Sequence, residues 1–147
     1  MTAFSNPADS EIVALLNGAK TIALLGASTN PQRAAHYVMA FLQEKGHRVI
    51  PVNPGLAGQT LLGETVYARL GDVPEKIDMV DVFRASEYLD GIVAECIEAG
   101  VPAIWTQLEV IDEAAAAKAR KAGLTVVMNK CPKIEYPRLG IAGPRGA

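Results

Sequence analysis

The stretch that decides the fold is Thr21-Ile22-Ala23-Leu24-Leu25-Gly26-Ala27-Ser28-Thr29-Asn30-Pro31. It predicts an apolar strand that leads directly into a turn of small residues and then into a helix. Such a turn aims backbone N–H groups and the positive end of a helix dipole at one point, which suits a phosphate or a diphosphate. A tight turn without a ligand is the alternative. The residues that we expect to contact the phosphate are Gly26, Ala27 and Ser28.

The same stretch lacks the features that mark a dinucleotide site. The NAD fingerprint is G-x-G-x-x-G, and only its first glycine, Gly26, is present. That fingerprint also requires an Asp or Glu at the end of the next strand, where this chain has Asn53 and Pro54. A neutral Asn tolerates a nearby phosphate that an acid would repel. We therefore expect Asn53 and Pro54 at the ligand, with an ordinary Asn-Pro turn as the alternative.

Segments with strand and helix patterns alternate along the chain. The predicted strands cover residues 21–26, 48–52, 77–83, 103–108 and 124–128, and the predicted helices cover 8–18, 31–45, 89–99 and 112–122. The strands are apolar along their whole length, which is typical of a parallel sheet buried on both faces. Right-handed crossovers then predict an α/β fold with a doubly wound, mainly parallel five-stranded sheet and helices on both faces.

The chain is predicted to form a single domain over residues 1–147, with a core over about 8–139. The connection 54–76 is rich in Gly and Pro, so we expect a loop with a short extended piece and no full crossover helix. From residue 129 onward the sequence predicts a polar tail without a further helix. The end of this tail, 140–147, is expected to be flexible.

The starts of the first two helices are predicted from residues that favour caps. Asp9 or Ser10 can cap the first helix, and Asn30 can cap the second, with Pro31 in its first position. Arg33 then lies in the first turn of the second helix, where a cation opposes the helix dipole. A bound phosphate would reverse this penalty, so Arg33 is a candidate ligand contact, and a solvated surface arginine is the alternative.

Composition excludes several classes of function. The chain has 147 residues, half of them hydrophobic, and a formal net charge of −2. It has no basic run that would indicate nucleic acid, and no apolar run near the ~18 residues of a membrane span. Its N-terminus lacks the features of a signal peptide, so we expect a cytoplasmic protein. Two cysteines and two histidines at unrelated spacings predict no metal site.

Ligands of doubly wound sheets bind at the carboxyl ends of the strands, which makes the residues there candidates. Phe83 and Arg84 follow the most apolar strand. Phe83 could pack on a ligand and Arg84 could meet a phosphate, or Phe83 could belong to the core and Arg84 to the surface. Asp78 and Asp81 interrupt that strand, which predicts either an edge position or hydrogen-bonded carboxylates.

Two cysteines differ in their expected roles. Cys96 lies in an apolar helical segment and is expected to be a small core residue. Cys131 follows the last strand, so it lies near the expected ligand. Lys130 and Lys133 are expected to lower the pKa of its thiol, which would favour a mixed disulfide with a thiol ligand. A structural, half-buried cysteine is the alternative.

Six pieces of the sequence, in this order and over about residues 12–139, resemble a known family. They are Gly26-Ala27-Ser28 with Pro31 and Arg33; Val49-Ile50-Pro51-Val52-Asn53-Pro54; Gly63-Glu64 with Val66-Tyr67; Ile77-Asp78 with Val80-Asp81-Val82-Phe83-Arg84; Trp105 with Gln107-Leu108; and Gly123-Leu124 with Val126-Val127-Met128, Cys131, Lys133 and Glu135. The chain is similar to the small stand-alone CoA-binding proteins of the Rossmann type, which are related to the CoA-binding domain of the succinyl-CoA synthetase α subunit. The resemblance implies a Rossmann-like fold that binds coenzyme A or an acyl-CoA across the strand ends, with no established chemistry.

The chain departs from the usual family pattern at Glu109, Asn129 and Lys130, where glycine, aspartate and arginine are common. Three functions stay open at this point: a CoA-binding module, a small NAD(P)-linked or acyl-CoA-processing enzyme, and a structural subunit. The chain has no G-x-S-x-G elbow, and neither His36 nor His47 is at a strand end, so no general base is apparent. The sequence therefore favours the binding module and leaves any protein partner unidentified.

Overall fold

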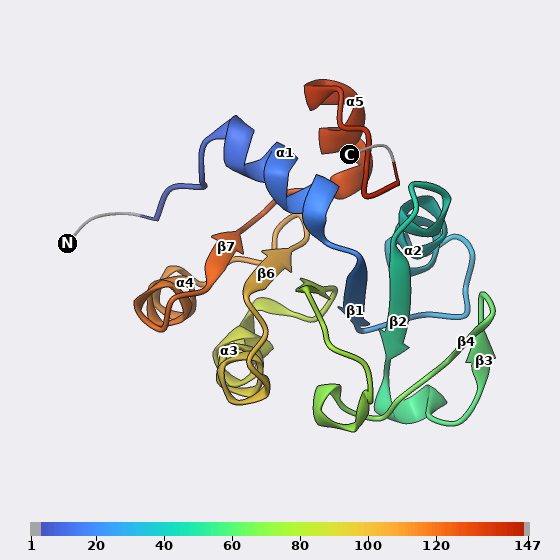
Figure 1. Cartoon of the computed structure of the whole chain (residues 1–147). Coiled ribbons are helices and arrows are strands. Elements are labelled where there is room, and N and C mark those ends of the chain that lie inside the picture. Colours follow the sequence, from blue (N-terminus) through green and yellow to red (C-terminus); the bar gives the residue numbers. More distant parts are fainter. Residues whose placement is uncertain (1–3, 146–147) are drawn as a thin grey trace.

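Five parallel strands form one sheet at the centre of the structure, a computed structural model that describes residues 4–145 (Figure 1). The strands lie in the order β2-β1-β5-β6-β7, and their bounds are Thr21–Leu25 (β1), Arg48–Val52 (β2), Met79–Val82 (β5), Ala103–Thr106 (β6) and Thr125–Val127 (β7). All neighbouring pairs are parallel. The predicted Rossmann-like α/β fold is confirmed, although most of the predicted strands extend a little beyond the observed ones.

Helices cover both faces of this sheet (Figure 1). One face carries α1 (Asp9–Gly18), α2 (Ala34–Glu44) and α5 (Pro132–Leu139), and the other carries α3 (Leu89–Ala99) and α4 (Glu113–Lys121). The chain leaves β1 toward β2 on one side and later enters β5 on the other side of β1. The switch point of the sheet therefore lies between β1 and β5, where such folds bind ligands. No helix within residues 4–145 is long and apolar enough to cross a membrane.

The connection between β2 and β5 contains no α-helix, as the sequence predicts. It consists of the 3-10 turn η1 (Pro54–Leu56), the hairpin β3 (Thr60–Leu61) and β4 (Glu64–Thr65), and the 3-10 turn η2 (Leu70–Asp72). Tyr67 forms a parallel bridge with Val52, so the connection runs along the edge of the sheet after the hairpin. Leu70 and Tyr67 then pack on the apolar cluster that α3 and α4 also cover.

The predicted cap of α1 and the predicted start of α2 are wrong. α1 begins after Ala8, without a side-chain cap, because the carboxylate of Asp9 is paired with Arg138. α2 begins at Ala34 instead of residue 31. The oxygens of Asn30 accept hydrogen bonds from the N–H groups of residues 32 and 33, so Asn30 closes a separate tight turn ahead of the helix.

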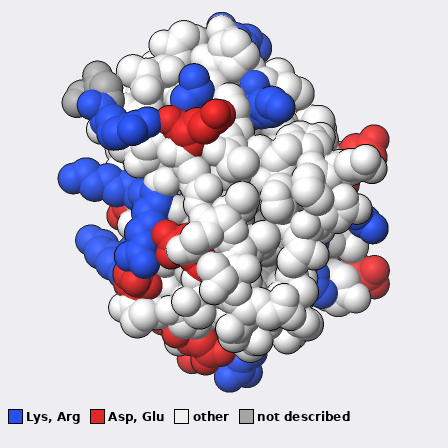
Figure 2. Space-filling model, turned by 90° about the vertical axis from the view of Figure 1, so that its right-hand side faces the viewer, with Lys and Arg blue, Asp and Glu red and all other residues white. Residues whose placement is uncertain are grey.

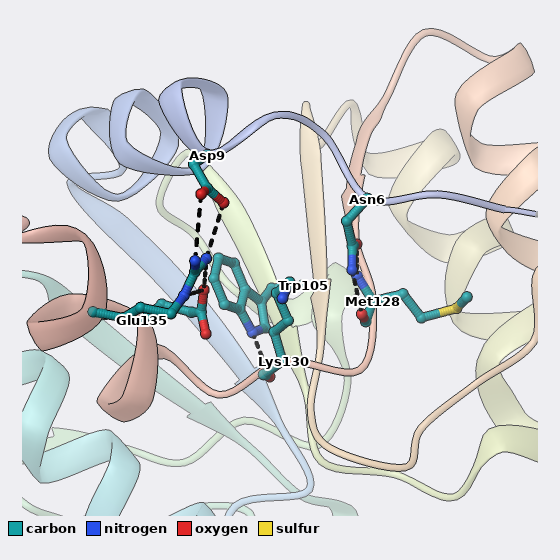
Figure 3. Close-up of polar contacts among 7 residues, drawn as sticks. Asn6, Asp9, Trp105, Met128, Lys130 and Glu135 are labelled. Atoms are coloured by element: carbon teal, nitrogen blue, oxygen red, sulfur yellow. Dashed lines mark hydrogen bonds and ion pairs between the residues drawn. The ribbon is translucent and has the colours of Figure 1, made fainter.

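The helix α5 is absent from the sequence prediction, because Pro137 resembles a helix breaker. The helix forms because two of its side chains are buried against the body of the protein. Tyr136 is 2% exposed and its hydroxyl is hydrogen-bonded to the ring of His47. Glu135 is 4% exposed and is paired with Arg138, which also reaches Asp9 on α1 (Figure 3). These contacts outweigh the hydrogen bond that a proline cannot donate.

The chain beyond α5 also contacts the body of the protein. Ile141 is buried in the cluster under α1 and α2. The N–H of Gly143 donates to the side chain of Asn17, and Arg145 donates to the carbonyl of Glu44. Of the segment that is expected to be flexible, residues 146–147 lie outside the described residues.

Gly26, directly after β1, lies close to the backbone at the end of β5. Its φ is +90°, a value that favours glycine. A Cβ atom at this position would lie 2.6 Å from the carbonyl oxygen of Phe83 and 3.2 Å from Cδ of Arg84. The space beside Gly26, where we expected a ligand, is therefore occupied by the backbone at the end of β5.

We expect Gly26→Ala to lower the free energy of unfolding by at least about 2 kcal/mol, because it combines a strained φ with a backbone clash. Gly91→Ala on α3 is the matched control, because a Cβ there meets nothing within 4 Å. It should instead stabilise the helix by about 0.5–1 kcal/mol. Urea denaturation of both variants measures this difference, and equal stabilities would contradict the close approach.

Candidate functional site

The ends of β1, β2 and β5 meet around a small cavity of about 190 Å³. Its lining includes three residues that the sequence predicts at the site, Gly26, Pro54 and Arg84. It also includes Arg69, which the sequence analysis missed because Arg69 follows an irregular loop instead of a strand. Two arginines and one acidic residue, Glu95, therefore line this cavity at the switch point.

The backbone after β1 leaves only some of its N–H groups free for a ligand. The N–H groups of Gly26 and Ala27 both donate to the carbonyl of Val52, so neither is available. Ala27 is also 2% exposed, which gives it a packing role. Within residues 4–145, no acceptor bonds the N–H groups of Ser28, Thr29, Ala34 and Ala35. Of the three predicted residues of this turn, only Ser28 therefore has a free N–H group, and the other free groups follow it.

Ser28 is held in place by contacts on both sides of its peptide unit. Its Oγ accepts a hydrogen bond from the N–H of Asn30, at 3.1 Å, so its own hydrogen is free to donate. Its carbonyl lies 2.9 Å from Nδ1 of His36, on the first turn of α2. His36 is a residue that the sequence analysis did not select. It stabilises the loop that carries the free N–H groups.

Asn53 joins the ends of β1 and β2. Its Nδ2 donates to the carbonyl of Ala27 at 2.8 Å, and its Oδ1 accepts from the N–H of Gly55 at 2.8 Å. Both ends of the side chain are therefore occupied by the protein itself. Asn53 positions the β1 loop, and it leaves the end of β2 without the negative charge that an NAD site has.

Arg33 is exposed and immediately precedes α2. Among the described residues, no carboxylate forms an ion pair with its guanidinium. It lies beside the free N–H groups of Ala34 and Ala35, at the positive end of the helix dipole. The positive charge of Arg33 is repelled by the positive end of the helix dipole. An anion bound between the guanidinium and the N–H groups would turn this repulsion into attraction.

Phe83 and Arg84 leave the sheet on opposite sides. Phe83 is half-buried against the apolar cluster below α1, α2 and α5. Arg84 faces the small cavity, and its guanidinium carbon lies 4.4 Å from the ring centre of Tyr88. This stacking holds Arg84 at the switch point without neutralising its charge.

Cys131 differs from its expected chemistry. It is the residue before α5 and is 9% exposed. Burial raises the pKa of its thiol, and the nearby carboxylate of Asp81 acts in the same direction. The N–H groups of Lys133 and Ile134 and the charge of Lys133 lower this pKa, but they do not outweigh burial. The expectation that neighbouring lysines give a low pKa is therefore wrong.

Asp81 is the most unusual titratable group near this edge. It lies in the interior of the sheet and is 0% exposed, so its interruption of the apolar strand does not reflect an edge position. Its Oδ1 accepts a hydrogen bond of 2.6 Å from Gln107, whereas its Oδ2 has no partner among the described residues. Burial raises the pKa of Asp81 to about 7, although the bond from Gln107 lowers it.

The loops after β6 and β7 are fastened to each other. Glu109 and Asn129 both have positive φ, at 68° and 61°, and the side chain of Asn129 accepts from the N–H of Glu109. Glu109 stands where the resembling family commonly has glycine, which suits such a φ. The indole of the buried Trp105 donates to the carbonyl of Lys130 (Figure 3). No group of three or more metal-ligating side chains occurs within residues 4–145.

Asp81→Asn should stabilise the protein at alkaline pH. The carboxyl pKa is raised in the folded state, so the folded state holds a proton that the unfolded state has lost between about pH 4 and 7. The wild type therefore loses stability as the pH rises from about 4 to about 7, and its stability is level with respect to this group at higher pH. The Asn side chain keeps the bond from Gln107 and carries no charge. We expect the variant to gain roughly 2–4 kcal/mol relative to wild type between pH 4 and pH 8. Urea unfolding at both values measures this change; a pH-independent difference would contradict it.

Comparisons with known proteins identify the family of this chain. The sequence model of the family described as "CoA binding domain" matches residues 20–137. The chain is 36% identical over 131 residues to the uncharacterized protein YneT of Bacillus subtilis, covering 89% of this chain and 96% of YneT. A solved structure from Thermus thermophilus has a TM-score of 0.86 and 39% identity, over 90% of this chain and 99% of that one.

A longer protein contains a similar unit. The dinucleotide-forming acetyl-coenzyme A synthetase 1 of Ca. Korarchaeum cryptofilum matches with a TM-score of 0.65 and 25% identity. The match covers 78% of this chain and 27% of the synthetase, so it is confined to one part of that protein. With the family match over most of its length and a relative above one-third identity, this chain belongs to the CoA-binding domain family.

Proposed function

We propose that this protein binds coenzyme A or an acyl-CoA at the carboxyl ends of β1, β2 and β5, and that binding is its function. The observation that carries the proposal is the set of four N–H groups without acceptors beside the unpaired Arg33. Together they form a site for an anion with more than one oxygen, such as a diphosphate. The family of the chain makes CoA the first candidate for that anion.

Hydrogen-bond donors and cations close to the site must attract this ligand, because the net charge of the protein does not. The net charge of the chain is −2, and CoA is strongly negative. Figure 2 views the side that carries α2 and the β3–β4 hairpin, where Lys and Arg gather along one side and most of the remaining surface is uncharged. The cations proposed for the ligand are Arg69 and Arg84, which line the small cavity together with the acidic Glu95, and Arg33, which precedes α2.

The end of β2 favours CoA over NAD. An acid at this position would accept hydrogen bonds from a ribose and would repel a phosphate on that ribose. Asn53 is neutral, and its Oδ1 is already occupied by the N–H of Gly55. A ligand with an additional phosphate near its ribose, as CoA has, therefore meets no opposing charge here.

Isothermal titration calorimetry with CoA, acetyl-CoA, NAD, NADP and ATP tests this function. We expect CoA or acetyl-CoA to bind most tightly, with a Kd on the order of micromolar, or about −8 kcal/mol. Tighter binding of NAD than of CoA would contradict the proposal. The measurement uses the whole chain and needs no assumption about catalysis.

Arg33→Ala should weaken CoA binding by roughly 1.5–3 kcal/mol, which is the scale of a charge-assisted hydrogen bond. The fold should be unaffected, because Arg33 is exposed and has no ion pair among the described residues. Lys121→Ala is the control, because Lys121 is exposed at the other end of the sheet, in the last turn of α4. Equal affinities of both variants at low salt would show that Arg33 does not contact the ligand.

A further inference from the structure

Exposed apolar side chains gather at the edge of the sheet where the strands end. Among the described residues, seven large apolar side chains are exposed, namely Tyr37, Leu62, Tyr88, Ile97, Leu108, Ile111 and Ile134. Five of them follow the ends of strands or lie in the first turns of α2 and α5, whereas Leu62 lies on the β3–β4 hairpin and Ile97 near the end of α3. Grouped apolar side chains mark a contact with a ligand or a partner, and single ones need no explanation.

Three of these side chains, those of Tyr88, Leu108 and Ile111, belong to two neighbouring loops, and we call them the apolar patch. Tyr88 ends the 3-10 turn η3 (Ser86–Tyr88), which follows β5, and the other two follow β6. Ser86 joins the two loops, because its Oγ donates to the carbonyl of Glu109 at 3.2 Å and accepts from the N–H of Ile111 at 2.8 Å. The apolar patch therefore spans the ends of β5 and β6.

The loop after β6 is held in place by hydrogen bonds. The hydroxyl of Thr106 donates to the carbonyl of Val110 at 2.7 Å, and the N–H of Glu109 donates to the loop after β7 at 2.7 Å. In this ordered loop Leu108 is 53% exposed and Ile111 is 44% exposed. Exposure of apolar surface to water costs free energy, which a ligand that covers the apolar patch would recover.

The apolar patch is continuous with the candidate site. Arg84 lines the small cavity at the switch point, and its guanidinium carbon lies 4.4 Å from the ring centre of Tyr88. Tyr88 is therefore separated from the cavity by one side chain. A ligand that occupies the switch point and extends past Arg84 reaches Tyr88 first and the loop after β6 next.

The order of the strands determines which part of CoA reaches the apolar patch. The proposed function puts the ribose at the end of β2 and the diphosphate at the loop after β1, and β5 and β6 follow on the other side of β1. In CoA the diphosphate lies between the ribose and the pantetheine arm, which ends in the thiol or the acyl group. Neighbouring strands are about 4.8 Å apart, so the arm has to cross about 10 Å from β1 to β6.

We propose that the apolar patch is an acyl subsite, and that the ligand of this protein is an acyl-CoA with an apolar acyl chain. This inference rests on the proposed CoA-binding function and names the class of ligand for the same site. The acyl chain packs on Tyr88, Leu108 and Ile111, and each methylene group that is removed from water adds to the affinity. Binding is non-covalent and includes no chemical step.

Isothermal titration calorimetry with acetyl-CoA and octanoyl-CoA tests the acyl subsite. We expect octanoyl-CoA to bind wild type at least about tenfold more tightly than acetyl-CoA, because its longer chain covers more of the apolar patch. In Leu108→Ser and in Ile111→Ser the ratio of the two affinities should fall by about threefold or more. The ratio is measured within each variant, so that a general effect on CoA binding cancels.

Ile97→Ser is the matched control, because Ile97 is also apolar and 38% exposed but lies near the end of α3, at the opposite edge of the sheet. It should keep the wild-type ratio. An unchanged ratio in both loop variants, or an equal fall in Ile97→Ser, overturns the acyl subsite. If a loop variant fails to fold, the wild-type ratio decides, and equal affinities for acetyl-CoA and octanoyl-CoA overturn the inference.

S-octanoylpantetheine, which lacks the nucleotide and the diphosphate, separates this inference from the proposed function. If both are correct, octanoyl-CoA binds more tightly than S-octanoylpantetheine and more tightly than CoA. Equal binding of octanoyl-CoA and S-octanoylpantetheine, weakened in Leu108→Ser, would support the acyl subsite and contradict the diphosphate site. Binding of CoA without a preference for octanoyl-CoA would overturn the acyl subsite and leave the proposed function intact.

A contact between two copies of the chain is the other use of such a surface. Sedimentation velocity of wild type and Leu108→Ser, measured beside the calorimetry, detects it. A wild-type dimer that the substitution dissociates, together with equal affinities for acetyl-CoA and octanoyl-CoA, would assign the apolar patch to that contact and overturn the acyl subsite.

Discussion

The close approach of β1 and β5 at Gly26 is the constraint on which the rest of the structure depends. The carbonyl oxygen of Phe83 lies where any side chain at position 26 would begin. This contact brings together the two strands from which the chain turns to opposite halves of the sheet. The β1 loop, which carries the free N–H groups of Ser28 and Thr29, therefore starts beside the end of β5, and Arg84 after β5 stacks on Tyr88.

Hydrogen bonds between loops order this edge of the sheet, where we propose the ligand site. Asn53 joins the β2 end to the β1 loop, and Asn129 joins the β7 end to the β6 loop. The indole of Trp105 fixes the chain just before Cys131. None of these bonds uses the N–H groups of Ser28 and Thr29 in the β1 loop, so these two groups are free for a ligand. A site that is ordered before binding loses less conformational entropy on binding.

Sequence patterns predict the fold well and the site in part. Strands that are apolar along their whole length indicate a parallel sheet that is buried on both faces. Their alternation with helical segments therefore predicts the order of strands and helices along the chain. The start of α2 could not be predicted, because Asn30 and Pro31 form a tight turn as readily as a helix cap. The helix α5 escaped prediction because its stability comes from tertiary contacts of Tyr136 and Glu135, which no local pattern contains.

The same limit applies to the residues of the site. Gly26, Pro54 and Arg84 are found at one cavity because each ends a predicted strand. Arg69 lines that cavity from an irregular loop, so no strand pattern marks it. The thiol of Cys131 depends on burial and on a carboxylate about 50 residues away in the sequence, and both outweigh the adjacent lysines. Contacts of this kind are visible only in the folded chain.

The central claim is that a diphosphate of CoA is held by the free N–H groups between β1 and α2. A ¹H–¹⁵N NMR titration of the whole protein with CoA tests this claim most directly. The account predicts that the largest and saturable changes occur at the amides of Ser28, Thr29, Ala34 and Ala35, and that NAD causes smaller changes. Unchanged amides at these four positions, with CoA bound elsewhere, would contradict it.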